Sequence, residues 1–190
     1  MNQVRLNAGI WRSRVLKFPD AEGLRPTADR VRQTLFNWLG QDMTGKVCLD
    51  LFAGTGALGF EALSRNARQV TILELAKVPF QALLQNQRLL GAAQADIRQI
   101  DALQFLAQNR QRYDVIFCDP PYHKQWLDKL LPLLSAHLAE DGVLYVEAEY
   151  ALKSDPDWQV VKSGKAGQVF YHLLRPEQAN ITAQAIIDTP

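Results

Sequence analysis

The sequence contains an acid–Pro–Pro–aromatic segment, Asp119-Pro120-Pro121-Tyr122, directly after the apolar stretch YDVIFC. Two prolines after an apolar strand end its hydrogen-bonded ladder and fix the backbone. The carboxylate of Asp119 and the backbone carbonyl of Pro120 can accept both N–H bonds of a planar amine. Tyr122 can then stack on the ring that carries this amine. These three residues are therefore the candidate catalytic residues.

The chemistry of such an amine explains why these residue types are needed. The lone pair of an exocyclic base amine is delocalised into the ring, so the nitrogen is a poor nucleophile. Groups that accept its N–H bonds direct the lone pair toward an electrophile held in line, and the protein contributes orientation and electrostatics. The segment matches the signature of methyltransferases that act on planar amino nitrogens. A target base within a helix would have to be flipped out.

A glycine-rich turn follows the apolar run KVCLDLF and precedes a predicted helix, ALGFEALSR. Gly54 and Gly56 allow a tight turn and a close approach to a ligand. Glu74 ends the next apolar run, where a carboxylate can accept hydrogen bonds from ribose hydroxyls. The glycines alone fit a dinucleotide or S-adenosylmethionine. Asp50 favours the second ligand, because a carboxylate suits a sulfonium cation and is awkward beside a pyrophosphate.

Asp101 follows a weakly marked strand near residues 96–100. Its carboxylate can pair with an adenine amino group or cap the helix that follows, and both roles can hold. The predicted cofactor-binding residues are Asp50, Phe52, Gly54, Gly56, Glu74, Leu75, Asp101, Ala102 and Asp119. Cys48 and Cys118 have neither CxxC nor Cys/His metal-site spacing. We expect buried free thiols and no metal.

Apolar strands alternate with helices from about residue 46 and end in a hairpin, WQVVKSGKAGQVFYHLLR. This pattern predicts an α/β, Rossmann-like, doubly wound and mostly parallel sheet with an antiparallel C-terminal hairpin strand. Residues 2–18 predict one or two short strands. Thr27 is the expected N-cap of a helix over residues 28–39, in which Arg30 and Arg32 can point away from the buried face. We divide the chain into an arm (1–40), a methyltransferase domain (41–176) and a tail (177–190).

Composition and charge restrict the partners. The 190 residues are 47% hydrophobic and 22% charged, with a net charge of +1, as in an ordinary globular domain. No apolar run approaches the ~20 residues of a membrane span, and we expect a cytoplasmic protein without a membrane partner. Residues 1–40 hold seven basic against three acidic side chains, whereas the rest of the chain has a net charge of −3. A basic arm suggests a polyanionic partner. Trp11 is either a stacking ring or a core anchor.

On these motifs the sequence resembles the RsmD-type family of bacterial 16S rRNA guanine-N2 methyltransferases. The resemblance runs to about Arg175 and is carried by GLRPTADRVRQTLFNWL, DLFAGTGALGFEALSR, DPPY, GVLYVE and AGQVFY. It implies a seven-stranded sheet and methyl transfer from S-adenosylmethionine to the N2 amine of a guanine in 16S rRNA, leaving S-adenosylhomocysteine. It also implies that the arm contacts ribosomal RNA or a small-subunit assembly particle. The expected RNA contacts are Arg12, Arg25, Arg30 and Tyr122.

Two other activities remain open at this point. Another amino-group methyltransferase on the same scaffold would act on adenine N6 of DNA or on a protein glutamine. A nicotinamide-dependent oxidoreductase would use the glycine turn but would not explain the DPPY segment. We expect the chain to act as a monomer.

Overall fold

A computed structural model describes residues 2–20, 26–122 and 125–177 of the chain. Arg25 and the predicted tail beyond residue 177 lie outside these ranges. Within them, no helix is long and apolar enough to cross a membrane.

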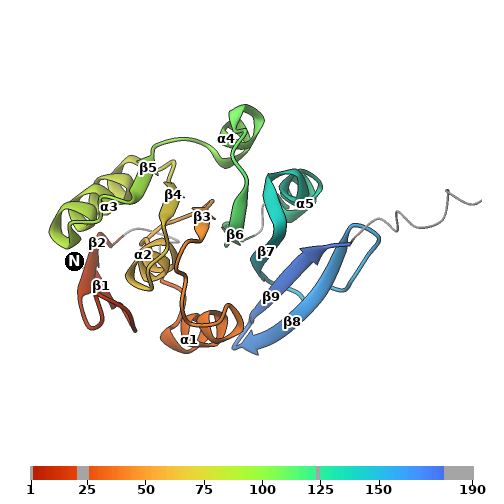
Figure 1. The fold of residues 1–190 in the computed structure, drawn as a ribbon, viewed down its shortest axis with the longest axis horizontal. Coiled ribbons are helices and arrows are strands. Elements are labelled where there is room, and N and C mark those ends of the chain that lie inside the picture. The colour runs from red at the N-terminus through yellow and green to blue at the C-terminus, as the bar shows by residue number, and fades with distance from the viewer. Residues whose placement is uncertain (1, 21–25, 123–124, 178–190) are drawn as a thin grey trace, which may run out of the picture.

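The central element is a seven-stranded sheet with the strand order β5-β4-β3-β6-β7-β9-β8 (Figure 1). Strands β3 to β7 are parallel, and β9 is antiparallel to both of its neighbours. The predicted fold class is therefore confirmed. The strands are β1 (Asn2–Arg5), β2 (Val15–Phe18), β3 (Val47–Asp50), β4 (Gln69–Leu73), β5 (Ala95–Arg98), β6 (Tyr113–Cys118), β7 (Leu138–Ala148), β8 (Trp158–Ala166) and β9 (Val169–Pro176).

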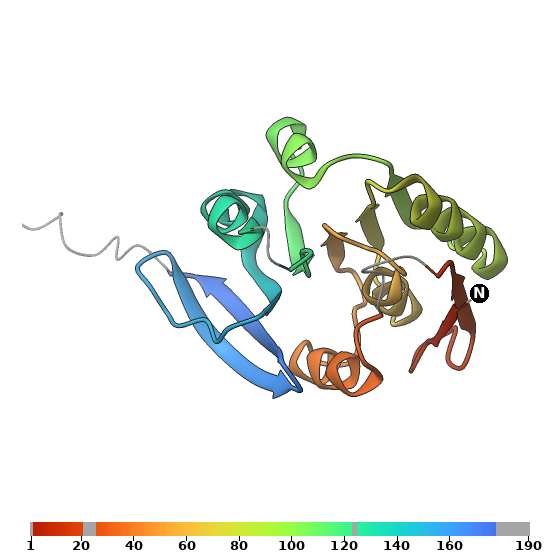
Figure 2. The same cartoon turned by 180° about the vertical axis from the view of Figure 1, so that it is seen from behind.

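Helices cover both faces of this sheet (Figures 1 and 2). They are α1 (Asp29–Trp38), α2 (Ala57–Ser64), α3 (Lys77–Leu90), α4 (Ala102–Gln108) and α5 (Trp126–Leu134), followed by a 3-10 turn, η1 (Ser135–His137). One apolar cluster joins β2, α1 and α2 to the sheet through residues such as Leu16, Phe36 and Phe60. A second cluster joins α4 and α5 to the opposite face through Phe105 and Leu130. The central strand β3, covered on both faces, is buried at every residue, as this arrangement requires.

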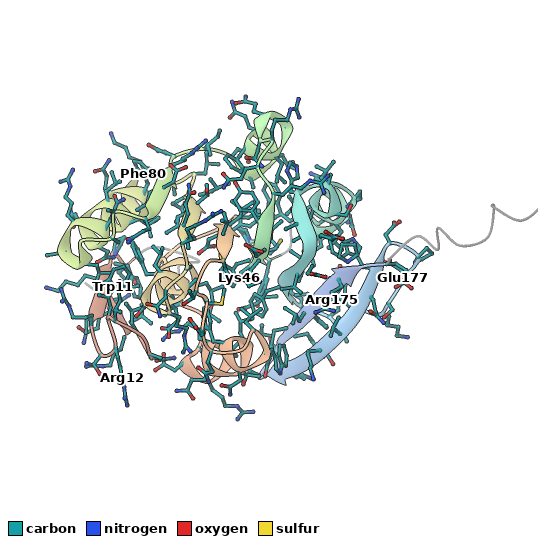
Figure 3. All side chains as sticks on the ribbon, in the orientation of Figure 1. Trp11, Arg12, Lys46, Phe80, Arg175 and Glu177 are labelled. Atoms are coloured by element: carbon teal, nitrogen blue, oxygen red, sulfur yellow. The ribbon has the colours of Figure 1, made fainter. Side chains whose placement is uncertain are left out.

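The arm begins with an antiparallel hairpin of β1 and β2. The loop that connects these strands is hydrogen-bonded to the C-terminal end of α2. The amides of Ile10 and Trp11 donate to the carbonyl and the hydroxyl of Ser64, at 2.7 and 3.0 Å. Gly9 has a φ of +80°, and a Cβ there would lie 1.7 Å from the Ser64 carbonyl oxygen. Only glycine fits this contact. Trp11 is buried in the core, so of its two considered roles the structure supports the anchor (Figure 3).

Two predictions about the start of α1 are wrong. Arg32 does not point away from the buried face: it is fully buried and donates to the carbonyl of Arg5 (2.7 Å) and to a carboxylate oxygen of Asp29 (2.5 Å). The guanidinium is needed there because it connects β1 to the first turn of α1. Thr27 is not the N-cap, since Ala28 holds that position without a side-chain cap. The Thr27 side chain instead lies near the Glu147 carboxylate of β7.

The apolar cluster that contains Leu16 and Phe36 also contains Cys48 and Phe117, so the core is continuous across residue 40. The division of the chain at that residue stays a prediction.

Candidate functional site

Acidic side chains stand at the carboxyl ends of four neighbouring parallel strands. Asp50 is the last residue of β3, Glu74 follows β4, Asp101 precedes α4 after β5, and Asp119 follows β6. Because the carboxyl ends of parallel strands meet at one edge, this is where an open α/β sheet binds its ligand. The structure therefore brings the four predicted carboxylates to the same edge of the sheet.

The glycine turn lies between β3 and α2. Gly54 and Gly56 have φ values of +51° and +77°, a region that L side chains rarely adopt. A Cβ on Gly56 would lie 2.5 Å from the Leu83 side chain. The amides of Gly54 and Ala76 donate to the two carboxylate oxygens of Glu74, at 3.0 and 2.7 Å. Glu74 is thus held against the turn, and its remaining lone pairs can accept ligand hydroxyls.

Asp50 is buried beneath this turn. Its Oδ2 accepts the amide of Gly59 at 3.1 Å, and Gly59 leaves room for that carboxylate, since a Cβ there would lie 3.2 Å from it. Burial raises the pKa of Asp50 to about 7, and the nearby Glu74 carboxylate contributes to this rise. A cationic ligand beside Asp50 would favour the charged form.

The remaining predicted cofactor residues surround the turn. Asp101 caps α4, accepting the amides of Leu103 and Gln104 at 2.9 and 3.0 Å, so its predicted capping role is confirmed. Ala102 is buried and Leu75 is exposed. Phe52 packs edge-to-face on Trp126, the first residue of α5, with ring centroids 5.3 Å apart.

Asp119 and Tyr122 lie beside a further carboxylate, Glu147 of β7. Burial, followed by the charges of Glu147 and Asp50, raises the pKa of Asp119 well above its ordinary value. Burial and the carboxylates of Asp119 and Glu147 raise the pKa of Tyr122 to about 12. The Tyr122 side chain is 39% exposed and Pro120 is buried. A ring is thus presented at the surface next to acceptor groups.

Sequence reasoning missed Glu147. Within YVEAEY, Glu147 is an acidic residue between the apolar residues Val146 and Ala148, which are both buried in the structure. A charged residue inside an apolar strand is the sequence signal that could have identified it. The position of Glu147 beside Asp119 depends on the pairing of β7 with β6, which the sequence pattern does not specify.

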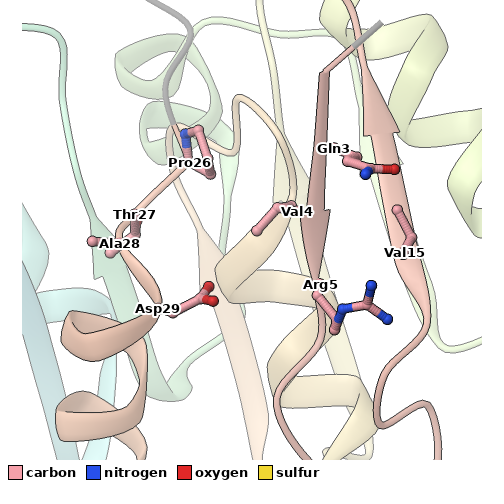
Figure 4. A pocket seen from close by; sticks show the side chains of 8 residues that line it. All are labelled: Gln3, Val4, Arg5, Val15, Pro26, Thr27, Ala28 and Asp29. Carbon is pink, nitrogen blue, oxygen red and sulfur yellow. The ribbon is translucent and has the colours of Figure 1, made fainter.

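The predicted RNA contacts Arg12 and Arg30 lie on different elements of the arm. Arg12 lies in the arm loop (Figure 3), Arg30 lies in the first turn of α1, and both are exposed. A cavity of about 330 Å³ lies between the arm hairpin and the segment that leads into α1 (Figure 4). Its lining includes Gln3 and Arg5 of β1, together with Thr27. None of the four carboxylates at the carboxyl ends of the strands lines this cavity.

The chemistry of these groups fits S-adenosylmethionine. Carboxylates suit its cationic sulfonium and ammonium and its hydroxyl and amine donors, whereas the phosphates of a dinucleotide would be repelled by them. Among the described residues, no group of three or more His, Cys, Asp or Glu side chains could hold a metal ion. Cys48 and Cys118 are buried and free, and burial raises the pKa of both thiols.

Comparisons with known proteins show the family of this chain. The model of the family described as "Conserved hypothetical protein 95" matches residues 4–175. The "Ribosomal RNA small subunit methyltransferase D" of Escherichia coli strain K12 is 42% identical over 180 residues, covering 92% of this chain and 91% of the relative. The chain belongs to the RsmD family of methyltransferases.

Two further matches cover the same extent of this RsmD-family chain. The Haemophilus influenzae protein of the same name is 42% identical over 179 residues, covering 90% of this chain and 93% of the relative. The solved structure of the yhhF protein from Escherichia coli has a TM-score of 0.84 and 41% identity, covering 93% of this chain and 99% of that one. The whole site lies within the matched length.

Proposed function

We propose that this chain transfers a methyl group from S-adenosylmethionine to the exocyclic N2 amine of a guanine in small-subunit ribosomal RNA. The observation that carries the proposal is the position of Asp119 and Tyr122, directly after β6, at the sheet edge that also holds the glycine turn. The names of the relatives support ribosomal RNA as the substrate. The basic, exposed Arg12 and Arg30 support a polyanionic partner.

Four parts of the site would hold the cofactor. When bound, S-adenosylmethionine supplies an electrophilic methyl group on a cationic sulfur. The Gly54–Gly56 turn leaves room for close approach of the ligand, and Glu74 would accept the ribose hydroxyls. Asp50 would face the cationic part, and Asp101 with Ala102 would contact the adenine.

The target amine would be oriented by the DPPY segment. Asp119 and the Pro120 carbonyl accept its two N–H bonds, and Tyr122 stacks on the base. The amine loses one proton on methylation. The Asp119 carboxylate can hold that proton, because burial and Glu147 raise its pKa. The base reaches the site only when flipped out of any helix that contains it.

This assignment is tested by offering labelled S-adenosylmethionine together with small-subunit rRNA, duplex DNA and a glutamine-containing protein extract. We expect the label in the RNA alone. Label in DNA or protein would favour another amine methyltransferase on the same scaffold.

Cofactor affinity should depend on pH through Asp50. The folded pKa of about 7 lies above the ordinary value of 3.8, so Asp50 is mostly protonated at pH 6 and is faced there by Glu74 and Asp119. As the pH rises toward 7, we expect the Kd of S-adenosylhomocysteine, which keeps the cationic ammonium, to fall by up to about tenfold per pH unit, and to level off above pH 7. Calorimetric titration from pH 5.5 to 8 measures this. Asp50→Asn should flatten the profile, and an unchanged slope would assign it to another group.

The raised pKa of Asp50 also determines how this residue contributes to folding stability as the pH changes. A carboxyl whose pKa is raised on folding binds its proton more tightly in the native state. Its contribution to stability is therefore largest below its ordinary pKa and is lost as the pH rises toward about 7.

RNA affinity should depend on the arm. Arg12→Ala combined with Arg30→Ala should weaken RNA binding and reduce the salt slope by about 0.7–0.9 for each phosphate that is no longer neutralised. Filter binding over a range of salt concentrations measures both quantities. Arg110→Ala with Arg112→Ala is the matched control, because these exposed arginines lie outside the arm, directly before β6. Equal effects of the two pairs would remove the arm from the RNA interface.

A further inference from the structure

Glu147 lies beside Asp119 because of the strand register. In the parallel pair of β6 and β7, Phe117 is opposite Tyr145 and Cys118 is opposite Val146, so Asp119 comes next to Glu147. The rings of Phe117 and Tyr145 pack against each other on the α1–α2 face of the sheet. Because side chains alternate along a strand, residues two positions further on return to that face. The two carboxylates therefore share one face at one edge.

The Glu147 carboxylate is buried but held in a defined orientation. Glu147 is only 5% exposed to solvent. The Tyr145 hydroxyl donates to Oε1 at 2.8 Å, and the Thr27 side chain lies near the carboxylate. A carboxylate has about four acceptor positions, so about three remain for other donors. A buried acid that is oriented by the Tyr145 hydroxyl and keeps acceptor positions unused suits a group that receives a ligand donor.

We propose that Glu147 is the residue that selects guanine, by accepting the ring N1–H of the base whose N2 amine is held by Asp119. This inference rests on the proposed function. Guanine carries N1–H and N2–H donors side by side on one edge, which matches two adjacent carboxylates. Adenine offers an amine beside an unprotonated N1, whose lone pair would face the Glu147 carboxylate. A site built to accept a ligand N–H rejects an analogue that lacks it, because a buried polar group is then left unpaired.

The test compares guanine with 2-aminopurine at the target position of RNA that the wild-type enzyme methylates. 2-Aminopurine keeps the 2-amine but has an unprotonated N1. We expect wild-type kcat/KM to favour guanine by about 100-fold or more. Glu147→Gln can turn an amide N–H toward that N1. This variant should lose activity on guanine and gain it on 2-aminopurine, lowering the preference at least about tenfold.

Three controls separate this role from a structural one. Tyr145→Phe removes a hydroxyl from Glu147 but keeps the carboxylate, so it should slow both substrates without changing their ratio. Glu140→Gln, exposed at the other end of β7, should change neither rate. Folding of each variant is checked by its melting temperature and its affinity for S-adenosylhomocysteine.

Two results would overturn the role of Glu147: equal wild-type rates on guanine and 2-aminopurine, or an unchanged ratio in a folded Glu147→Gln enzyme. A wild-type enzyme that methylates no guanine would instead overturn the proposed function.

Discussion

Replacing Asp119 with alanine should abolish methyl transfer while leaving the protein folded. The substitution removes the carboxylate that orients the target amine, and losses of at least about 100-fold in kcat follow when one such preorganised group is removed. Stability should be retained or rise slightly, because Asp119 lies among the like charges of Glu147 and Asp50. Transfer of labelled methyl groups to RNA, followed under single-turnover conditions, measures the effect.

The matched control is Asp128→Ala. Asp128 is an exposed acid in the first turn of α5, two residues after Trp126, and its loss should leave the rate within about twofold. The melting temperature and the affinity for S-adenosylhomocysteine should be close to wild type in both variants. An Asp119→Ala enzyme that folds, binds cofactor and still transfers methyl groups at the wild-type rate would contradict the proposed mechanism.

Replacing Glu61 with alanine should cause a large loss of stability, of about 3–5 kcal/mol. Glu61 is fully buried in α2, where it accepts the amides of Asn7 and Ala8 at 2.8 and 3.1 Å and pairs with Arg65 at 2.8 Å. Removing it leaves two amides and the buried Arg65 guanidinium without their acceptor. Urea unfolding, followed by far-UV circular dichroism, measures the change.

An exposed ion pair provides the comparison. Asp96 and Arg98 are 2.6 Å apart on β5, but about half of the Arg98 side chain is in solvent. Asp96→Ala should therefore cost no more than about 1 kcal/mol. A Glu61→Ala protein as stable as Asp96→Ala would show that the contact between the arm and α2 does not hold the arm in place.

Local sequence patterns predicted the parts of the site that depend on local geometry. Gly54, Gly56 and Glu74 follow from a strand–turn–helix unit, in which the positions of the glycines and the next strand end are set within some 20 residues. The strand–helix alternation predicted the sheet and its hairpin. Capping by Asp101 was one of two predicted roles, because the helix signal begins directly after it.

Other features depend on contacts between distant segments. Arg32 faces the interior because β1 packs against the first turn of α1 and supplies a carbonyl, and helical periodicity does not contain that information. Thr27 lies near Glu147 of the distant strand β7 and does not cap α1, since Ala28 holds the N-cap position. Glu147 lies beside Asp119 because of the register of β7 against β6. Long-range pairing of this kind is decided by tertiary packing rather than by local propensity.

The identity of the methylated nucleoside tests guanine-N2 methylation by this chain. Small-subunit rRNA is incubated with the purified chain and labelled S-adenosylmethionine, digested to nucleosides, and separated by chromatography with mass detection. We predict that the label is found in N2-methylguanosine and that it is absent with Asp119→Ala. Label in N6-methyladenosine, or no label in the RNA, would contradict the proposed methylation of guanine N2.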